Sequence, residues 1–176
     1  MNKKYFPLVE RWNLPENALA NSIAEMSLEG AYGNEGVVLW LGRRSNKEAW
    51  ITHLVMLRGP GCIKRPAQLV IHESVLAAVT DIAIEYDVSL IGQIHSHGPG
   101  YGVDLSPTDR MYGVTVPYYL SLVAPDYAMR SDTSLIECGV HVLELGHGFR
   151  RLSSAEVESR VILTHGLLSH TLIIEE

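Results

Sequence analysis

Two histidines two residues apart are the side chains best placed to do chemistry in this sequence. His95 and His97 end an apolar segment, 89–97, which we predict to be a central β-strand. Residues i and i+2 on a strand point to the same face, so the two imidazoles would project side by side. Ligand sites of α/β proteins usually lie at the carboxyl ends of strands. The pair would supply half of a tetrahedral zinc site, or would be two solvent-facing histidines; the spacing alone leaves both open.

A carboxylate follows the histidines at a distance that allows a third ligand. The glycine- and proline-rich segment 98–102 leads to Ser106-Pro107-Thr108-Asp109, which is typical of a helix start. Ser-x-x-Asp is also an ordinary capping box, so Asp109 has a purely structural interpretation. The loop is nevertheless long enough to fold back over the histidines. Three protein ligands and one open position would form a catalytic zinc site.

Hydrolysis at such a site needs a carboxylate that is not on the metal to act as the base. Glu35 is the strongest candidate because it directly precedes a strand that we predict over 37–42. The alternative interpretation is that Glu35 is an exposed acid in the turn Gly-Asn-Glu-Gly. Other acids near predicted strand ends are Glu25, Glu29, Glu48 and Glu73.

The six remaining histidines have no partner at ligand spacing. We expect them to be ordinary surface or core residues rather than parts of a site. They are His53, His72, His141, His147, His165 and His170.

The segments that must position these residues alternate between helix and strand. Asn13 and Glu16 resemble a capping box for a first helix over 14–29, and apolar spacing predicts a second helix over 73–86. We expect a loop over 59–68, a short helix after Ser106, and a last helix from Ser153 to near Gly166. The predicted strands are 37–42, 49–57, 89–97, 118–124, 135–145 and 149–152. This pattern indicates an α/β (α+β) fold, a mixed β-sheet flanked by helices.

Length and composition place limits on the class of protein. The chain has 176 residues, of which 47% are apolar, so we expect one domain over 1–176. The net charge of −6 argues against a nucleic-acid surface, and no apolar run approaches a membrane span. No secretion signal is visible, and two cysteines suit a reducing compartment. We therefore expect a cytoplasmic protein.

Taken together, Glu35, His95-Ser96-His97, Ser106 and Asp109 resemble the JAMM metalloprotease motif of the JAB/MPN domain family. The resemblance covers about residues 30–125. It implies the JAB/MPN fold, which has a cytidine-deaminase-like architecture, with Zn2+ held by His95, His97 and Asp109. It also implies that Glu35 takes a proton from the metal-bound water and passes it to the leaving amine, while Ser106 donates to the oxyanion.

Three positions depart from the usual form of that motif. Eight residues, 98–105, separate the second histidine from Ser106, where seven are usual. Gly98 stands where a proline is more common, and Val38 stands where a glycine is usual. We expect the flexible glycine-rich loop to absorb the extra residue.

The resemblance implies a deubiquitinase-like isopeptidase of the stand-alone bacterial type. Its partner would be a ubiquitin-like protein or its conjugates, cleaved after the C-terminal glycine of an extended tail. Such a tail can dock by adding a strand to a sheet edge, framed here by segments 59–68 and 98–105.

Two alternatives remain on the same fold. One is a non-catalytic MPN-type interaction scaffold, and the other is a zinc hydrolase of small peptides or cysteine conjugates. A zinc deaminase is disfavoured because Cys62 and Cys138 lie far apart, outside any Pro-Cys-x-x-Cys motif.

Overall fold

The computed structural model describes residues 7–166, 168 and 170–175. Within them, no helix combines the length and hydrophobicity needed to cross a membrane. The strands are β1 (Arg11–Pro15), β2 (Val37–Ser45), β3 (Glu48–Arg58), β4 (Cys62–Arg65), β5 (Gln68–Ile71), β6 (Ser89–Ser96), β7 (Leu120–Ala124), β8 (Gly139–Glu144), β9 (Gly148–Arg151), β10 (Val161–Thr164) and β11 (His170–Glu175). The helices are α1 (Glu16–Gly30), α2 (Glu73–Glu85), α3 (Pro107–Tyr112) and α4 (Ser154–Arg160), with 3-10 turns η1 (Asp126–Ala128) and η2 (Leu135–Glu137).

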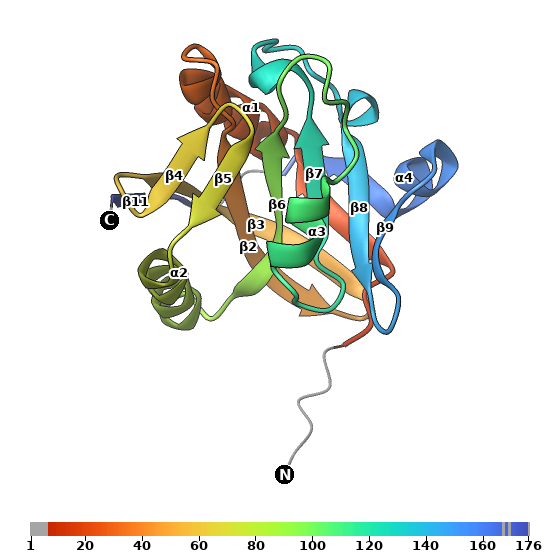
Figure 1. Cartoon of the computed structure of the whole chain (residues 1–176). Coiled ribbons are helices and arrows are strands. Elements are labelled where there is room, and N and C mark those ends of the chain that lie inside the picture. Colours follow the sequence, from red (N-terminus) through yellow and green to blue (C-terminus); the bar gives the residue numbers. More distant parts are fainter. Residues whose placement is uncertain (1–6, 167, 169, 176) are drawn as a thin grey trace.

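The main sheet is mixed and has the strand order β10-β1-β3-β2-β6-β7-β8-β9, with β11 also paired to β3. β2 and β3 form the predicted antiparallel hairpin, and β6 lies between antiparallel β2 and parallel β7. The expected mixed sheet flanked by helices is confirmed, as is the central position of the strand that carries the two histidines (Figure 1).

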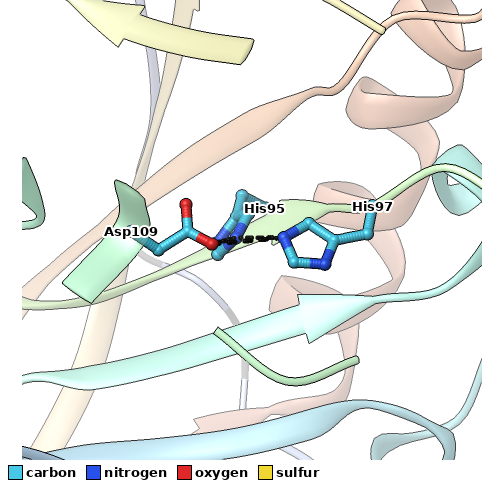
Figure 2. Close-up of side chains that lie close together, drawn as sticks. All are labelled: His95, His97 and Asp109. Atoms are coloured by element: carbon cyan, nitrogen blue, oxygen red, sulfur yellow. Dashed lines mark hydrogen bonds and ion pairs between the residues drawn. The ribbon is translucent and has the colours of Figure 1, made fainter. Parts of the chain in front are cut away.

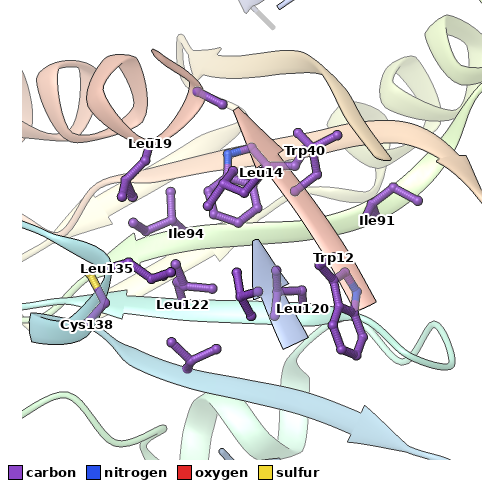
Figure 3. Close-up of a cluster of buried hydrophobic side chains, with 14 of the residues drawn as sticks. Trp12, Leu14, Leu19, Trp40, Ile91, Ile94, Leu120, Leu122, Leu135 and Cys138 are labelled. Atoms are coloured by element: carbon purple, nitrogen blue, oxygen red, sulfur yellow. The ribbon is translucent and has the colours of Figure 1, made fainter. Parts of the chain in front are cut away.

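The sheet is buried on both faces, which explains the unbroken apolar run of β2. Val38 and Trp40 belong to a core covered by α1, where the Trp40 indole donates to the Ser22 hydroxyl at 3.1 Å (Figure 3). Val37 and Leu39 point to the other face and pack in a second cluster with residues of α2. Because Val37 pairs directly with His95, that histidine shares the face covered by α2.

The first helix begins later than the sequence predicts, and its expected cap is wrong. Asn13 belongs to β1, where its side-chain amide donates to the Ala49 carbonyl at 3.4 Å. Pro15 is the residue before the helix, and its side chain makes no capping bond. The sequence of this short strand alternates polar and apolar residues over only four positions before Pro15, and Asn13 is equally typical of a helix cap. The strand is therefore recognised only by its parallel pairing with β3 and β10.

Other differences between the predicted and observed elements arise where a strand pairs with a segment far away in the sequence or where its apolar pattern is weak. The expected loop over 59–68 is mostly the hairpin β4–β5. The expected last helix ends at Arg160, after which the chain continues as β10, because Val161 pairs with Trp12 of β1. The predicted strand 135–145 begins as η2 and becomes β8 only at Gly139, and β7 begins at Leu120 rather than at 118. β11 was not predicted at all.

Candidate metal centre

His95, His97 and Asp109 converge at the carboxyl end of β6 (Figure 2). The two histidines lie on β6 and just after it, and the aspartate lies in the first turn of α3, which crosses in front of β6 and β7 (Figure 1). The two Nε2 atoms are 3.2 Å apart, and Asp109 Oδ2 lies 3.3 Å from His97 Nε2 and 3.6 Å from His95 Nε2. Both imidazoles are buried, with 1% and 5% exposure. Within the described residues, this is the one convergent group of three ligand side chains.

The donor set and its spacing fit a zinc ion. Ligand atoms about 2.05 Å from a tetrahedral zinc lie roughly 3.3 Å from one another, which agrees with the three separations above. His97 Nδ1 faces the Gly102 carbonyl at 3.2 Å, and a carbonyl can only accept. The proton of a neutral His97 is therefore on Nδ1, which leaves the Nε2 lone pair for a metal.

The capping box fixes the position of Asp109 and is compatible with a role for Asp109 as a metal ligand. The Ser106 amide donates to Asp109 Oδ2 at 2.8 Å, and the Asp109 amide donates to the Ser106 hydroxyl at 3.1 Å. Burial by itself would raise the pKa of Asp109. Without a metal, hydrogen bonds that His95 and His97 donate from Nε2 when their rings are protonated outweigh burial and hold the pKa of Asp109 well below its ordinary value. The structural and functional interpretations of Ser-x-x-Asp are thus compatible.

Glu35 is buried beside this centre and is not the exposed turn residue of the alternative interpretation. Its exposure is 8%, and its amide donates to the Arg65 carbonyl at 3.0 Å. Val37 pairs with His95, and the Ser96 amide donates to the Gly36 carbonyl, so the antiparallel pairing brings Glu35 opposite His97. Burial raises the pKa of Glu35 to about 7; the nearby His97 lowers it and Asp109 adds to the rise.

The loop between the histidines and Ser106 is held against the sheet. Gly100 and Gly102 have positive φ values of 85° and 71°, a backbone conformation that glycine adopts without strain and that lets the loop turn back. Asp104 Oδ1 lies 2.8 Å from Nε2 of the fully buried His141. His141 is thus a core histidine with a hydrogen-bonding partner, in agreement with the expectation for it, and it lies on β8 beside β7.

Val38 points into the core covered by α1, away from the metal centre.

A cavity of about 110 Å³ adjoins His95 and Asp109. Its apolar wall includes Leu69 and Ile71 of β5 and Leu76 of α2. The β4–β5 hairpin thus borders the cavity through β5 residues that lie just beyond segment 59–68. Among the described strands, β5 pairs only with β4, so its second edge belongs to no other β-ladder.

The chain matches no protein-family model and no curated protein sequence. Its fold is similar to the solution structure of a protein from Desulfitobacterium hafniense, a structural genomics target. The TM-score is 0.64 over 89% of this chain and 94% of that one, at 17% sequence identity. At this identity the similarity shows a shared fold and carries no statement about function.

Proposed function

We propose that this protein is a zinc-dependent peptidase of the JAMM type on a JAB/MPN fold. The observation that carries the proposal is the convergence of His95, His97 and Asp109 next to the buried carboxyl of Glu35. A scaffold protein has no need of three ligand atoms at tetrahedral spacing, with the His97 ring and the Asp109 carboxylate both held by hydrogen bonds to the backbone. When bound, zinc would supply Lewis acidity, which polarises a carbonyl and makes hydroxide available near neutral pH.

In this proposal, Glu35 moves the protons. A base works best when its pKa lies near the working pH, and the pKa of about 7 allows Glu35 both to accept and to release a proton. Its backbone is held by the antiparallel pairing of β2 with β6 and by the Arg65 carbonyl. The carboxyl therefore has a defined position with respect to His97.

Ser106 is the candidate oxyanion donor. Its hydroxyl is fixed at the start of α3, next to Asp109, because it accepts the hydrogen of the Asp109 amide in the capping box. A preorganised donor of this kind contributes roughly 10²–10³ in rate.

The substrate that best fits the surroundings is an extended tail that ends in glycine, as in a ubiquitin-like protein. The second edge of β5 can pair with such a tail, and β5 itself lines the cavity beside His95. Glycine has no side chain and can approach the buried histidines closely. Cleavage would occur after the C-terminal glycine, either in a precursor or in a conjugate.

The test compares metal-free protein, zinc-reconstituted protein and the Asp109→Asn variant. Each is incubated with ubiquitin-like modifiers fused through a C-terminal Gly-Gly to a reporter and, in parallel, with the free tail peptide. Zinc-dependent release from the fusion supports the proposal, and release from the free peptide alone favours the small-peptide hydrolase. A protein that takes up no zinc under any condition would refute a metal-dependent function.

A further inference from the structure

Tyr127 lies at the centre of a backbone turn with an unusual conformation. Asp126, Tyr127 and Ala128 have φ values of 52°, 55° and 56°, so three consecutive residues with side chains adopt the left-handed region. Such residues are rarely found there in succession, because each Cβ approaches a carbonyl oxygen. The turn persists because it is packed on several sides, and the first of these contacts is to a proposed metal ligand: the Tyr127 amide donates to the His97 carbonyl at 2.8 Å.

The ring of Tyr127 covers the residue that follows His97. A Cβ placed on Gly98 would lie 2.5 Å from the Tyr127 hydroxyl oxygen and 2.6 Å from the ring carbon that carries it. Gly98 does not have a positive φ, so its backbone would accept alanine. A side chain at this position would therefore have to displace the tyrosine ring.

The hydroxyl of Tyr127 reaches the turn of the β4–β5 hairpin. It donates to the Pro66 carbonyl at 2.9 Å. The neighbouring carbonyl, that of Arg65, accepts the amide hydrogen of Glu35 at 3.0 Å. Two adjacent carbonyls at the β4–β5 turn therefore accept hydrogen bonds from the site: that of Pro66 from Tyr127, and that of Arg65 from Glu35.

We propose that Tyr127 is a positioning residue that fixes Glu35 relative to His97 by clamping the hairpin turn to the end of β6. The clamp consists of the Tyr127 hydroxyl bond to Pro66, the Arg65 bond to Glu35 and the ring contact over Gly98. The inference rests on the proposed function for its catalytic consequence. The mechanical link itself can be measured in metal-free protein.

The first experiment uses Tyr127→Phe, which keeps the ring and the backbone bond to His97 and removes only the hydroxyl. Tyr32→Phe is the matched control because that tyrosine is 83% exposed. Hydrogen exchange of the Glu35 amide is followed by NMR in metal-free protein, with the Trp40 amide in the middle of β2 as the internal reference. We expect exchange at Glu35 to be about fivefold faster in Tyr127→Phe, the effect of one neutral hydrogen bond, and unchanged in the control.

The second experiment is a double-mutant cycle with Co2+ as a spectroscopic probe of the metal centre. Gly98→Ala forces a Cβ against the tyrosine ring, so we expect about tenfold weaker Co2+ binding and an altered visible spectrum. In a Tyr127→Ala background the same Gly98→Ala change should have little effect, because the space is free. Rescue of this kind distinguishes the clamp from a general loss of stability.

The outcomes separate the clamp from the proposed function. Wild-type exchange at Glu35 in Tyr127→Phe, or an equal cost of Gly98→Ala in both backgrounds, refutes the clamp. If the wild-type protein binds neither Co2+ nor Zn2+, the proposed function fails, while the exchange experiment still decides whether Tyr127 holds the hairpin.

Discussion

Replacement of Glu35 by glutamine should stabilise the metal-free protein at high pH. The ordinary pKa of this carboxyl is 4.5, and burial raises it to about 7 in the folded protein. The folded state therefore holds the proton more tightly than the unfolded chain, so the contribution of Glu35 to stability is complete below pH 4.5 and is lost as the pH rises through 7. Glu35→Gln mimics the protonated side chain and removes this loss.

The size of the effect follows from the pKa difference. At roughly 1.4 kcal/mol per pKa unit, the penalty at pH 8 reaches at most about 3 kcal/mol. For a chain of this length that corresponds to an increase of up to about 10 °C in the Tm of the variant at pH 8. At pH 5 about a quarter of the penalty remains, so the Tm of the variant should exceed that of the wild type by only about 2 °C.

The assay is thermal unfolding of chelator-treated protein at pH 5 and pH 8, with Glu85→Gln as the control for an exposed carboxylate on α2. The charges of His97 and Asp109 also shift the pKa of Glu35, and the raised pKa of His97 depends in part on the charge of Glu35. The difference in Tm between variant and wild type therefore includes this coupling. Buried His53 and His141, whose pKa values are lowered, act in the opposite direction in both proteins and cancel in the comparison. An equal difference in Tm between variant and wild type at both pH values would refute the burial argument.

In a separate activity assay, Glu35→Gln should abolish peptidase activity without loss of zinc.

Three further substitutions test other parts of the site. Asp109→Asn should reduce the zinc content, measured by elemental analysis, from one equivalent to near zero, because a neutral amide replaces the carboxylate ligand; full retention of zinc would remove Asp109 from the ligand set. Ser106→Ala should cost about 1 kcal/mol in chemical denaturation through loss of the cap and should lower turnover while zinc remains bound. Zinc loss in that variant would show instead that Ser106 acts only by holding Asp109. Gly139→Ala places a Cβ 1.7 Å from the Val103 carbonyl oxygen, so it should destabilise the fold by about 1–3 kcal/mol and speed zinc release to a chelator; an unchanged release rate would show that the loop does not hold the metal.

Much of the site could be predicted from short-range sequence pattern. The two-residue period of a strand was sufficient to place His95 and His97 on one face, and the Ser-x-x-Asp cap was sufficient to place Asp109 at a helix start. The position of Glu35 just before an apolar strand indicated that its backbone would be fixed. These inferences depend only on local geometry, and the structure brings three of these side chains together as candidate ligands.

Only the tertiary structure decided the features that depend on pairing between distant segments. The burial of Glu35, and with it the pKa of about 7, arises because β2 pairs with β6 and the β4–β5 turn covers the end of the strand. The contacts of Tyr127 with Gly98 and Pro66 join segments about 30 and 60 residues apart, and no period in the sequence encodes such a contact. Strand β1 is hard to predict for the same reason: its sequence alternates over only four residues before Pro15, and its two parallel neighbours come from far along the chain. Local order follows from residue spacing, whereas burial and charge coupling follow from which segments pack together.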